Sequence, residues 1–185
     1  WTTFTGSVPE DAFGKTVVYH YGVEITNDDG TTEKLYDYVM SDLTIHSFGG
    51  TKNITFASNE DGKTVTAYSI WPNENSTKIP ASIKVNGISY KVTAIGNYVN
   101  ENKKLKAVTI PATVKSIGKE AFVNAKDLKT ITINGNVTKI GANAFKGINK
   151  KAVFKIKTAS SNYKKIVSKI KKAGAPKSVT FKIVK

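Results

Sequence analysis

Apolar and polar side chains alternate along most of the first part of the chain. Valine, tyrosine and isoleucine occupy every second position of residues 17–25, and residues 33–40 alternate in the same way. A period of two places the apolar side chains on one face of a strand. The turn-forming sequence Asn27-Asp28-Asp29-Gly30 joins the two segments and predicts a β-hairpin. Similar patterns at 43–48, 53–57 and 63–70 predict that residues 1–76 are nearly all β.

The second part of the chain contains an internal repeat. Ile-Gly pairs occur at 95–96, 117–118 and 140–141, at spacings of 22 and then 23 residues. Periods of about 20–29 residues are typical of solenoids, in which each copy must stack on its neighbour to bury its apolar side. Two copies correspond position by position, through Leu105 and Leu128, Val108 and Ile131, Ile110 and Ile133, Val114 and Val137, and Phe122 and Phe145.

The strand of each copy should also present an outward face. The outward positions are expected at Ala107, Thr109, Thr130, Thr132, Val153 and Lys155. These side chains are mostly small, whereas binding hot spots are usually tryptophan, tyrosine or arginine. We therefore expect no anchor for a partner on this face.

The repeat resembles a known bacterial family. Residues 110–122 have the sequence Ile-Pro-Ala-Thr-Val-Lys-Ser-Ile-Gly-Lys-Glu-Ala-Phe, which is similar to the repeat of the BspA-type leucine-rich repeat family, often found on surface proteins of gut and oral bacteria. Residues 79–96 resemble the family's first repeat, in which a hairpin is inserted, but Asn97-Tyr98-Val99 stands where Ala-Phe is usual. The resemblance covers about residues 77–185. It implies a β-rich solenoid that binds or adheres through surfaces that differ between members.

Residues 158–185 are predicted to form a helix-strand cap. After Ser160 or Ser161 as N-cap, apolar residues recur at helical spacing until Ala173-Gly174 and Pro176 end the helix. The last copy of a solenoid must cover the open apolar stack, and this apolar stripe is only as long as a cap needs, which favours a cap over a membrane-surface helix. The polar face of the helix forms a candidate polyanion patch at Lys164, Lys165, Lys169, Lys171 and Lys172.

Charge divides the chain near residue 76. Residues 1–76 carry 11 acidic residues and 4 lysines, whereas residues 77–185 carry 3 acidic residues and 24 lysines. Such asymmetry indicates a change of module, and residues 72–76 have the composition of a linker. We therefore expect an acidic β-rich region over 1–76, either a cap or a small β domain, followed by a basic leucine-rich-repeat solenoid over 77–185.

The composition also limits the partners. The chain has no cysteine and no arginine, so all 28 basic residues are lysine. Lysine-rich surfaces attract polyanions in a salt-dependent way, but specific recognition of bases and phosphates favours arginine. We expect non-specific polyanion attraction and no specific nucleic-acid partner. The absence of cysteine favours a bacterial product over a disulfide-bonded eukaryotic domain, and no apolar run approaches the ~20 residues of a membrane span.

The sequence offers little for catalysis. The imidazoles are His20 and His46, both in expected strands, and no nucleophile elbow, phosphate-binding loop or zinc-protease motif occurs. Residues 27–30 and 59–62 lack the further carboxylate of a calcium loop and are interpreted as turns. We predict a protein that is not an enzyme and that needs no metal or cofactor.

Aromatic residues suggest a glycan site. Exposed tryptophan and tyrosine can stack on the apolar face of a sugar. Candidates are Trp71 beside Asn73, and the strand segment Tyr36, Asp37 and Tyr38, although the tyrosines could instead pack in the β core. We expect a non-catalytic binding or adhesion module of a secreted or cell-surface bacterial protein that recognises a glycan or a host or bacterial surface protein. The alternative is a structural spacer of a larger surface protein, and the start at Trp1 is interpreted as processing or as a piece of a longer chain.

Overall fold

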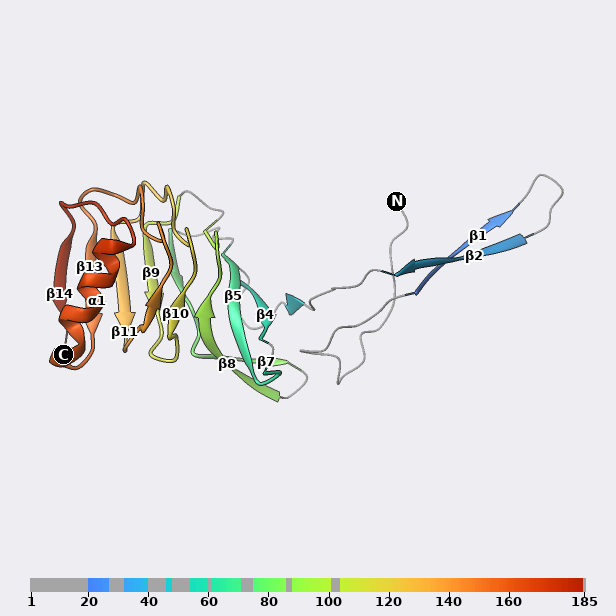
Figure 1. Cartoon of the computed structure of the whole chain (residues 1–185), viewed down its shortest axis with the longest axis horizontal. Helices are drawn as coiled ribbons and strands as arrows, with labels where there is room; N and C mark the ends of the chain where they lie inside the picture. The colour runs from blue at the N-terminus through green and yellow to red at the C-terminus, as the bar shows by residue number, and fades with distance from the viewer. Residues whose placement is uncertain are drawn as a thin grey trace. The chain divides into compact units, whose positions relative to one another are not determined.

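The computed structural model describes residues 20–26, 32–39, 46–47, 54–59, 61–70, 75–85, 88–100 and 104–184. The chain forms two compact units, Trp1–Ile45 and His46–Lys185. In the first unit, β1 (His20–Thr26) pairs antiparallel with β2 (Thr32–Val39), which confirms the predicted hairpin (Figure 1).

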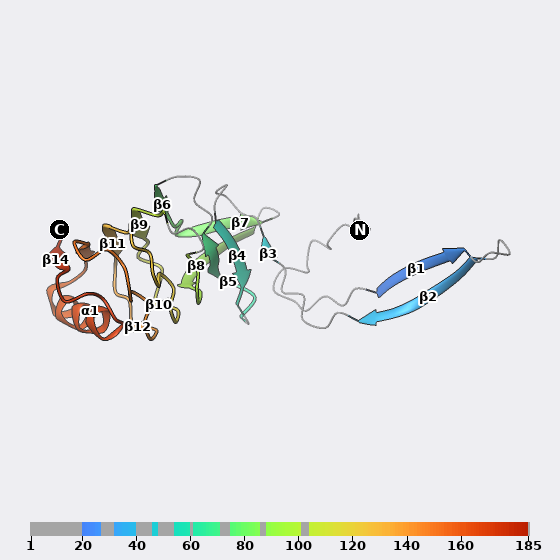
Figure 2. The ribbon, with the colours of Figure 1, turned by 90° about the horizontal axis from the view of Figure 1, so that it is seen from above.

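The second unit is a solenoid with two β walls. The chain passes from one wall to the other with each half-repeat, and Figure 2 shows the walls on opposite sides of the coil. The wall that we call the back sheet is built from parallel strands in the order β14 (Thr180–Ile183), β13 (Val153–Lys157), β11 (Thr130–Asn134), β9 (Ala107–Ile110) and β6 (Ser76–Lys78).

The opposite wall, which we call the front sheet, carries the candidate site. Its strands lie in the order β12 (Lys139–Ile140), β10 (Ser116–Ile117), β8 (Ile88–Ile95), β5 (Thr64–Ile70), β4 (Ile54–Ser58) and β3 (His46–Ser47). A further strand, β7 (Ser82–Val85), pairs antiparallel with β8 and forms the predicted inserted hairpin. Strands β5, β8, β10 and β12 are parallel to one another.

The core lies between the two walls and follows the alternation of the sequence. In the back sheet, Val108, Ile131 and Phe154 stand in register and are buried, as are the residues two positions further along. The predicted outward positions are confirmed, because Ala107, Thr109, Thr130, Thr132 and Val153 are partly exposed and Lys155 is exposed. A period of two therefore builds one apolar and one polar face on each strand.

Phenylalanine side chains link successive copies within the core. The rings of Phe122 and Phe145 stack with centroids 5.7 Å apart, Phe145 meets Phe154 edge-on at 5.1 Å, and Phe154 stacks on Phe181 at 5.3 Å. These separations fall in the favourable range for aromatic pairs. Phenylalanines of the repeats and of strands β13 and β14 thus form an unbroken series of ring contacts.

The glycines of the second and third Ile-Gly pairs are required by the spacing of the copies. A Cβ atom on Gly118 would lie 2.5 Å from the carbonyl carbon and oxygen of Gly96, and one on Gly141 would lie 2.4 Å from the backbone nitrogen of Lys119. These contacts are to backbone, which cannot rotate away. Only glycine lets neighbouring copies stack this closely.

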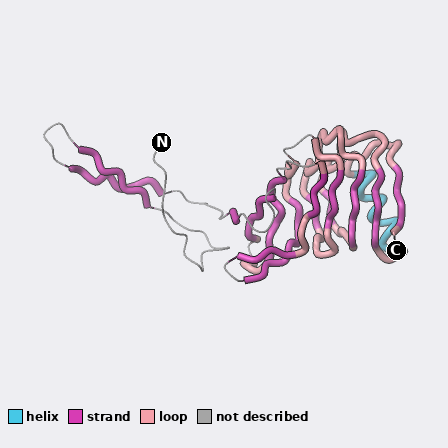
Figure 3. Tube along the Cα trace, turned by 180° about the vertical axis from the view of Figure 1, so that it is seen from behind, coloured by secondary structure: helices cyan, strands magenta, loops and turns pink. Residues whose placement is uncertain are grey.

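The C-terminal end of the unit is capped as predicted by a helix and a strand. Helix α1 (Ser160–Lys172) buries Ile166 and Ile170, and β14 adds to β13 (Figure 3). The predicted serine N-cap is wrong, because Ala159 holds that position and makes no side-chain cap bond. Since Ser160 and Ser161 are exposed, water can satisfy the N–H groups of the first turn. Within the described residues, no helix has the length and apolar character of a membrane span.

The charge boundary at residue 76 falls inside the second unit. Strand β5 lies before this boundary and pairs in parallel with β8, which lies after it. Residues 54–70 therefore extend the front sheet of the solenoid, and the compact units divide between Ile45 and His46 instead. The change of net charge along the sequence therefore does not coincide with a break in strand pairing.

Candidate ligand-binding groove

The outer face of the front sheet is hollowed along β5 and β8. One hollow of about 500 Å³ lies near the carboxyl ends of these strands and is lined by Thr66, Tyr68, Ala94, Ile95, Gly96, Asn97 and Tyr98. A second of about 830 Å³ lies beside the amino end of β5, extends to the first residues of β10 and β12, and is lined by Asn59, Asp61, Thr64, Thr93, Ala94, Lys115, Ser116, Thr138 and Lys139. Because Ala94 lines both, we treat them as parts of a single groove. We call the hollow with Tyr68 and Tyr98 the tyrosine arm and the hollow with Lys115 and Lys139 the lysine arm.

Tyr68 stands at the outer face of β5 because of strand alternation. Val65 and Ala67 point into the core and are fully buried, whereas Tyr68 is 52% exposed. Its neighbour is Gly96, which directly follows β8 and whose backbone N–H donates a hydrogen bond to the carbonyl of Ala67 at 2.8 Å. Since Gly96 has no side chain, the floor of the groove beside Tyr68 is open.

Tyr98 is held in an unusual backbone conformation. Its φ is +50°, and the corresponding residues of the next two copies, Glu120 and Asn143, have φ of +55° and +56°. The turn after each Ile-Gly pair thus requires a left-handed residue. An aromatic side chain is unfavourable there, at a cost of about 1–3 kcal/mol. Tyr98 is nevertheless present and 53% exposed, so its strained position displays an aromatic ring at the rim of the groove.

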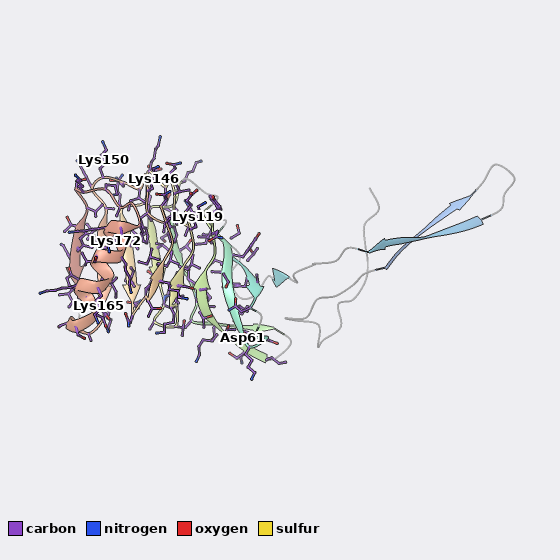
Figure 4. The ribbon with its side chains drawn as sticks, in the orientation of Figure 1. Asp61, Lys119, Lys146, Lys150, Lys165 and Lys172 are labelled. Carbon is purple, nitrogen blue, oxygen red and sulfur yellow. The ribbon has the colours of Figure 1, made fainter. Side chains whose placement is uncertain are left out.

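Asn97 connects the tyrosine arm to the next copy. Its Oδ1 accepts a hydrogen bond from the backbone N–H of Lys119 at 2.8 Å. Figure 4 places Lys119 at the top and Asp61 at the bottom of the front-sheet strands. The bond from Lys119 to Asn97 therefore lies at the end of the strands that is remote from Asp61. The side-chain NH₂ of Asn97 makes no bond within the described residues and can donate to a ligand.

A network of polar side chains forms one wall of the lysine arm. The Nδ2 of Asn59 donates to the hydroxyls of Thr64 at 2.7 Å and Thr93 at 3.2 Å, while its Oδ1 accepts from the hydroxyl of Thr66 at 2.7 Å. The network ties β5 to β8 where the register of their pairing shifts. Such bulges re-aim side chains next to functional sites.

Asp61 stabilises the turn between β4 and β5. Its carboxylate accepts hydrogen bonds from the backbone N–H of Lys63 and of Thr64, both at 2.9 Å, and from the Thr64 hydroxyl at 2.7 Å. The bond from the Lys63 N–H, followed by those from Thr64, lowers the pKa of Asp61. Both carboxylate oxygens are occupied, which gives Asp61 a structural role. Among the described residues, no three histidine, cysteine, aspartate or glutamate side chains gather as a metal site would require.

Comparison with known proteins identifies the repeat. Residues 93–180 match the family described as "BspA type Leucine rich repeat region (6 copies)". These residues are a BspA-type leucine-rich repeat region. The resemblance seen in the sequence is therefore confirmed over this range, and the tyrosine arm lies where the BspA-type region begins.

A solved structure of a bacterial surface protein shares the architecture of the BspA-type region. A leucine rich cell surface protein from Faecalibacterium prausnitzii A2-165 has 25% sequence identity and a TM-score of 0.51, over 77% of this chain and 44% of that one. A leucine-rich repeat protein from Bacteroides ovatus ATCC 8483 matches at 21% identity and a TM-score of 0.46, over 74% and 37% of the two chains. This chain thus spans less than half of the F. prausnitzii protein. A search of curated proteins found no significant match.

The structure leaves the residues predicted for glycan binding untested. Trp71 and Asn73 lie outside the described residues. Tyr36, Asp37 and Tyr38 lie on β2 in the unit Trp1–Ile45, of which only the backbone is described. Their roles in binding stay predictions.

The predicted lysine patch lies on α1, at the end of the BspA-type region. Lys164, Lys165, Lys171 and Lys172 are exposed, and Lys169 is half-buried. The Nζ of Lys171 lies 5.7 Å from the ring centroid of Phe181, within reach of a cation–π contact. One member of the patch thus also packs against the cap, and polyanion binding by the patch stays a prediction.

Sequence reasoning missed the two tyrosines of the groove, although it contained signals for both. Tyr98 belongs to the segment that departs from the usual Ala-Phe of the family repeat. Tyr68 falls on the outward side of a predicted strand, opposite Val65 and Ala67. The missing information was that the two residues lie on the same face, because that depends on the parallel pairing of β5 with β8.

Proposed function

We propose that this protein is a non-catalytic binding module of a bacterial surface protein and that it binds a glycan in the groove. The observation that carries the proposal is the pair of exposed tyrosines in the tyrosine arm. Tyr68 and Tyr98 line one hollow, more than half of each side chain is accessible, and Tyr98 occupies a strained position. Residues held in unfavourable backbone regions concentrate at functional sites.

The chemistry of the tyrosine arm suits a sugar. Aromatic rings provide a flat surface for the apolar C–H face of a pyranose, and their hydroxyls and nearby amides can bond to its edge. Asn97 supplies an NH₂ donor and Thr66 a hydroxyl, while Ala94 and Gly96 keep the floor low. The groove is open and shallow, which suits part of an extended chain better than a small enclosed molecule.

Two observations support a surface role without catalysis. The BspA-type region shares its fold with a cell surface protein of F. prausnitzii. In the described lining of the groove, the hydroxyl groups have no imidazole beside them, and the carboxylate of Asp61 is occupied by its own turn. A nucleophile therefore has no partner there that could activate it.

The test is a glycan array probed with the wild-type chain and with Tyr68→Ala and Tyr98→Ala. Loss of a stacked ring removes about 0.5–1.5 kcal/mol beyond the buried area, so each variant should bind several-fold more weakly. Ile183→Ala is the matched control, since Ile183 is 50% exposed but lies on β14. Trp71→Ala should accompany them, because Trp71 directly follows β5 in the sequence and remains a predicted binding residue.

Two results would contradict the proposal. Binding that both tyrosine variants retain in full would place the site elsewhere on the protein. Silence across the array would exclude the glycan groove and favour the alternative of a structural spacer. Melting temperatures of Tyr68→Ala, Tyr98→Ala and Ile183→Ala should stay within a few degrees of wild type, because these three residues are at least half exposed.

A further inference from the structure

The lysine arm suggests which class of glycan the groove receives. The registered pairs of the front sheet place Thr66, Ala94, Ser116 and Lys139 side by side on neighbouring strands. At about 4.8 Å per strand, this row is about 14 Å long. Its first three side chains are small and uncharged, and its last is a lysine. The groove therefore changes from an aromatic end to a cationic end.

The charge of Lys139 is not compensated within the described part of the groove. The carboxylate in the lining, Asp61, accepts three hydrogen bonds from its own turn. The Nζ of Lys115 donates to the backbone carbonyl of Ala112 at 3.1 Å, which directs that lysine to its own loop. Lys139 is exposed and forms no ion pair among the described residues.

The surroundings of Lys139 add to its attraction for an anion. Helix α1 lies next to β12 and carries the exposed lysines Lys164, Lys165 and Lys172 (Figure 4). Charges of one sign along a groove raise the local concentration of the opposite sign. The hydroxyl of Ser116, beside Lys139 in the row, makes no bond within the described residues and can donate to an oxyanion.

We propose that the groove recognises an acidic glycan, with sugar rings on Tyr68 and Tyr98 and a carboxylate or sulfate group at Lys139. The inference rests on the proposed function and adds the charge of the ligand to it. Lys139 occupies a position that carries serine in the preceding repeat and alanine in the repeat before that, so the repeat itself does not require a lysine there. The side chain is exposed, so its replacement spares the core.

The experiment compares charged and neutral forms of the same sugar chain by calorimetric titration. The carboxylate comparison uses oligogalacturonate and its methyl ester. The sulfate comparison uses a sulfated maltooligosaccharide and its unsulfated parent. The proteins are wild type, Lys139→Gln, Lys139→Arg and Lys150→Gln. Lys150 is the matched control, because it is also an exposed lysine and does not line the groove.

The expected result is selective. Lys139→Gln should weaken binding of a charged probe about tenfold, as the loss of a charge-assisted hydrogen bond predicts, and should leave the neutral probe unchanged. Lys139→Arg should retain binding, and Lys150→Gln should behave as wild type. The pair of probes in which Lys139→Gln weakens binding of the charged member identifies the anionic group. Raising the salt concentration should weaken the wild type more than Lys139→Gln.

Three results would overturn the inference, and they differ in what they say about the groove. Equal binding of charged and neutral probes that still depends on the tyrosines would leave a glycan site that does not read charge. Equal losses in Lys139→Gln and Lys150→Gln would reduce recognition to the overall positive charge. Binding that neither the charged group nor the tyrosines affects would remove the groove as a glycan site altogether.

Discussion

The first repeat, residues 75–100, and the regular repeats, residues 105–150, share a backbone path but differ in the side chains on it. Both have the Ile-Gly pair and a left-handed residue in the following turn. In the regular repeats, Phe122 and Phe145 then enter the core and stack. The first repeat has Asn100 at this position, and its side-chain amide is buried without a hydrogen-bond partner among the described residues.

The difference separates the requirements of the repeat from those of the site. Backbone stacking depends on glycine and on left-handed turns, and every copy meets these requirements. The first repeat gives up the packed phenylalanine at Asn100 and displays Tyr98 where the next two copies have Glu120 and Asn143. Strain and exposed aromatic surface therefore gather where the coil begins, which is where the groove lies.

The largest expected effect concerns the glycine stack. Gly118→Ala places a Cβ 2.5 Å from the backbone of Gly96, so we expect a loss of about 2–3 kcal/mol from overpacking. Gly96→Ala meets the carbonyl of Ala67 at 3.3 Å, and its reduced freedom in the unfolded chain offsets part of the strain, so it should stay within about 1 kcal/mol of wild type. Urea unfolding measures both. Equal losses in the free energy of unfolding for the two variants would show that the copies can move apart to make room for the Cβ that Gly118→Ala adds.

A smaller effect of opposite sign is expected at Tyr98. Tyr98→Asn puts a residue that tolerates the left-handed region at φ +50° and should raise the free energy of unfolding by about 1 kcal/mol. The same variant should lose glycan binding. Glu120→Asn is the matched control, at φ +55° in the next copy, and should gain stability without affecting binding. A Tyr98→Asn variant that is less stable than wild type would mean that the ring packs against the protein.

The smallest expected effect concerns Asp61, whose side-chain hydrogen bonds stabilise the turn before β5. The regular repeats instead depend on backbone hydrogen bonds between strands. The pKa of Asp61 is lowered in the folded protein by hydrogen bonds from Lys63 and Thr64. Its contribution to stability is therefore present above the unfolded pKa of about 3.9 and is lost as the pH falls through the lower, folded value.

Thermal unfolding between neutral pH and about pH 3 tests this contribution. Asp61→Asn should be slightly less stable than wild type at neutral pH, and the difference should shrink as the solution is acidified through the carboxylate range. A constant difference at every pH would show that the loss comes from the geometry of the turn and not from its charge.

Much of the fold could be predicted because its signals are local. The spacing of Ile-Gly, the alternation in residues 107–110 and 130–134, and the helical spacing before Gly174 each lie within one copy or one element. The N-cap at Ala159 was missed because serine is the better capping residue in isolation. The charge change near residue 76 was a poor guide to the compact units, because the pairing of β5 with β8 continues across it.

The candidate site was harder to predict than the fold. Glycan binding was expected at Trp71 and at residues 36–38, because aromatic residues next to amides and carboxylates are visible in the sequence. Tyr68 has no such neighbours along the chain, and Tyr98 follows Asn97 but falls in a turn of the repeat. Their exposure and proximity follow from the parallel pairing of β5 with β8, two strands that β7 separates along the sequence.

By itself, the sequence determined that this protein has a repeat, how long each copy is, which residues face its core and how it ends. These properties follow from periodicity, since a copy can bury its apolar side only by stacking on another. The tertiary structure decided that two tyrosines and a lysine from separate strands share one groove. Register between strands is a non-local property, set when the whole coil packs, and no single segment of the sequence carries it.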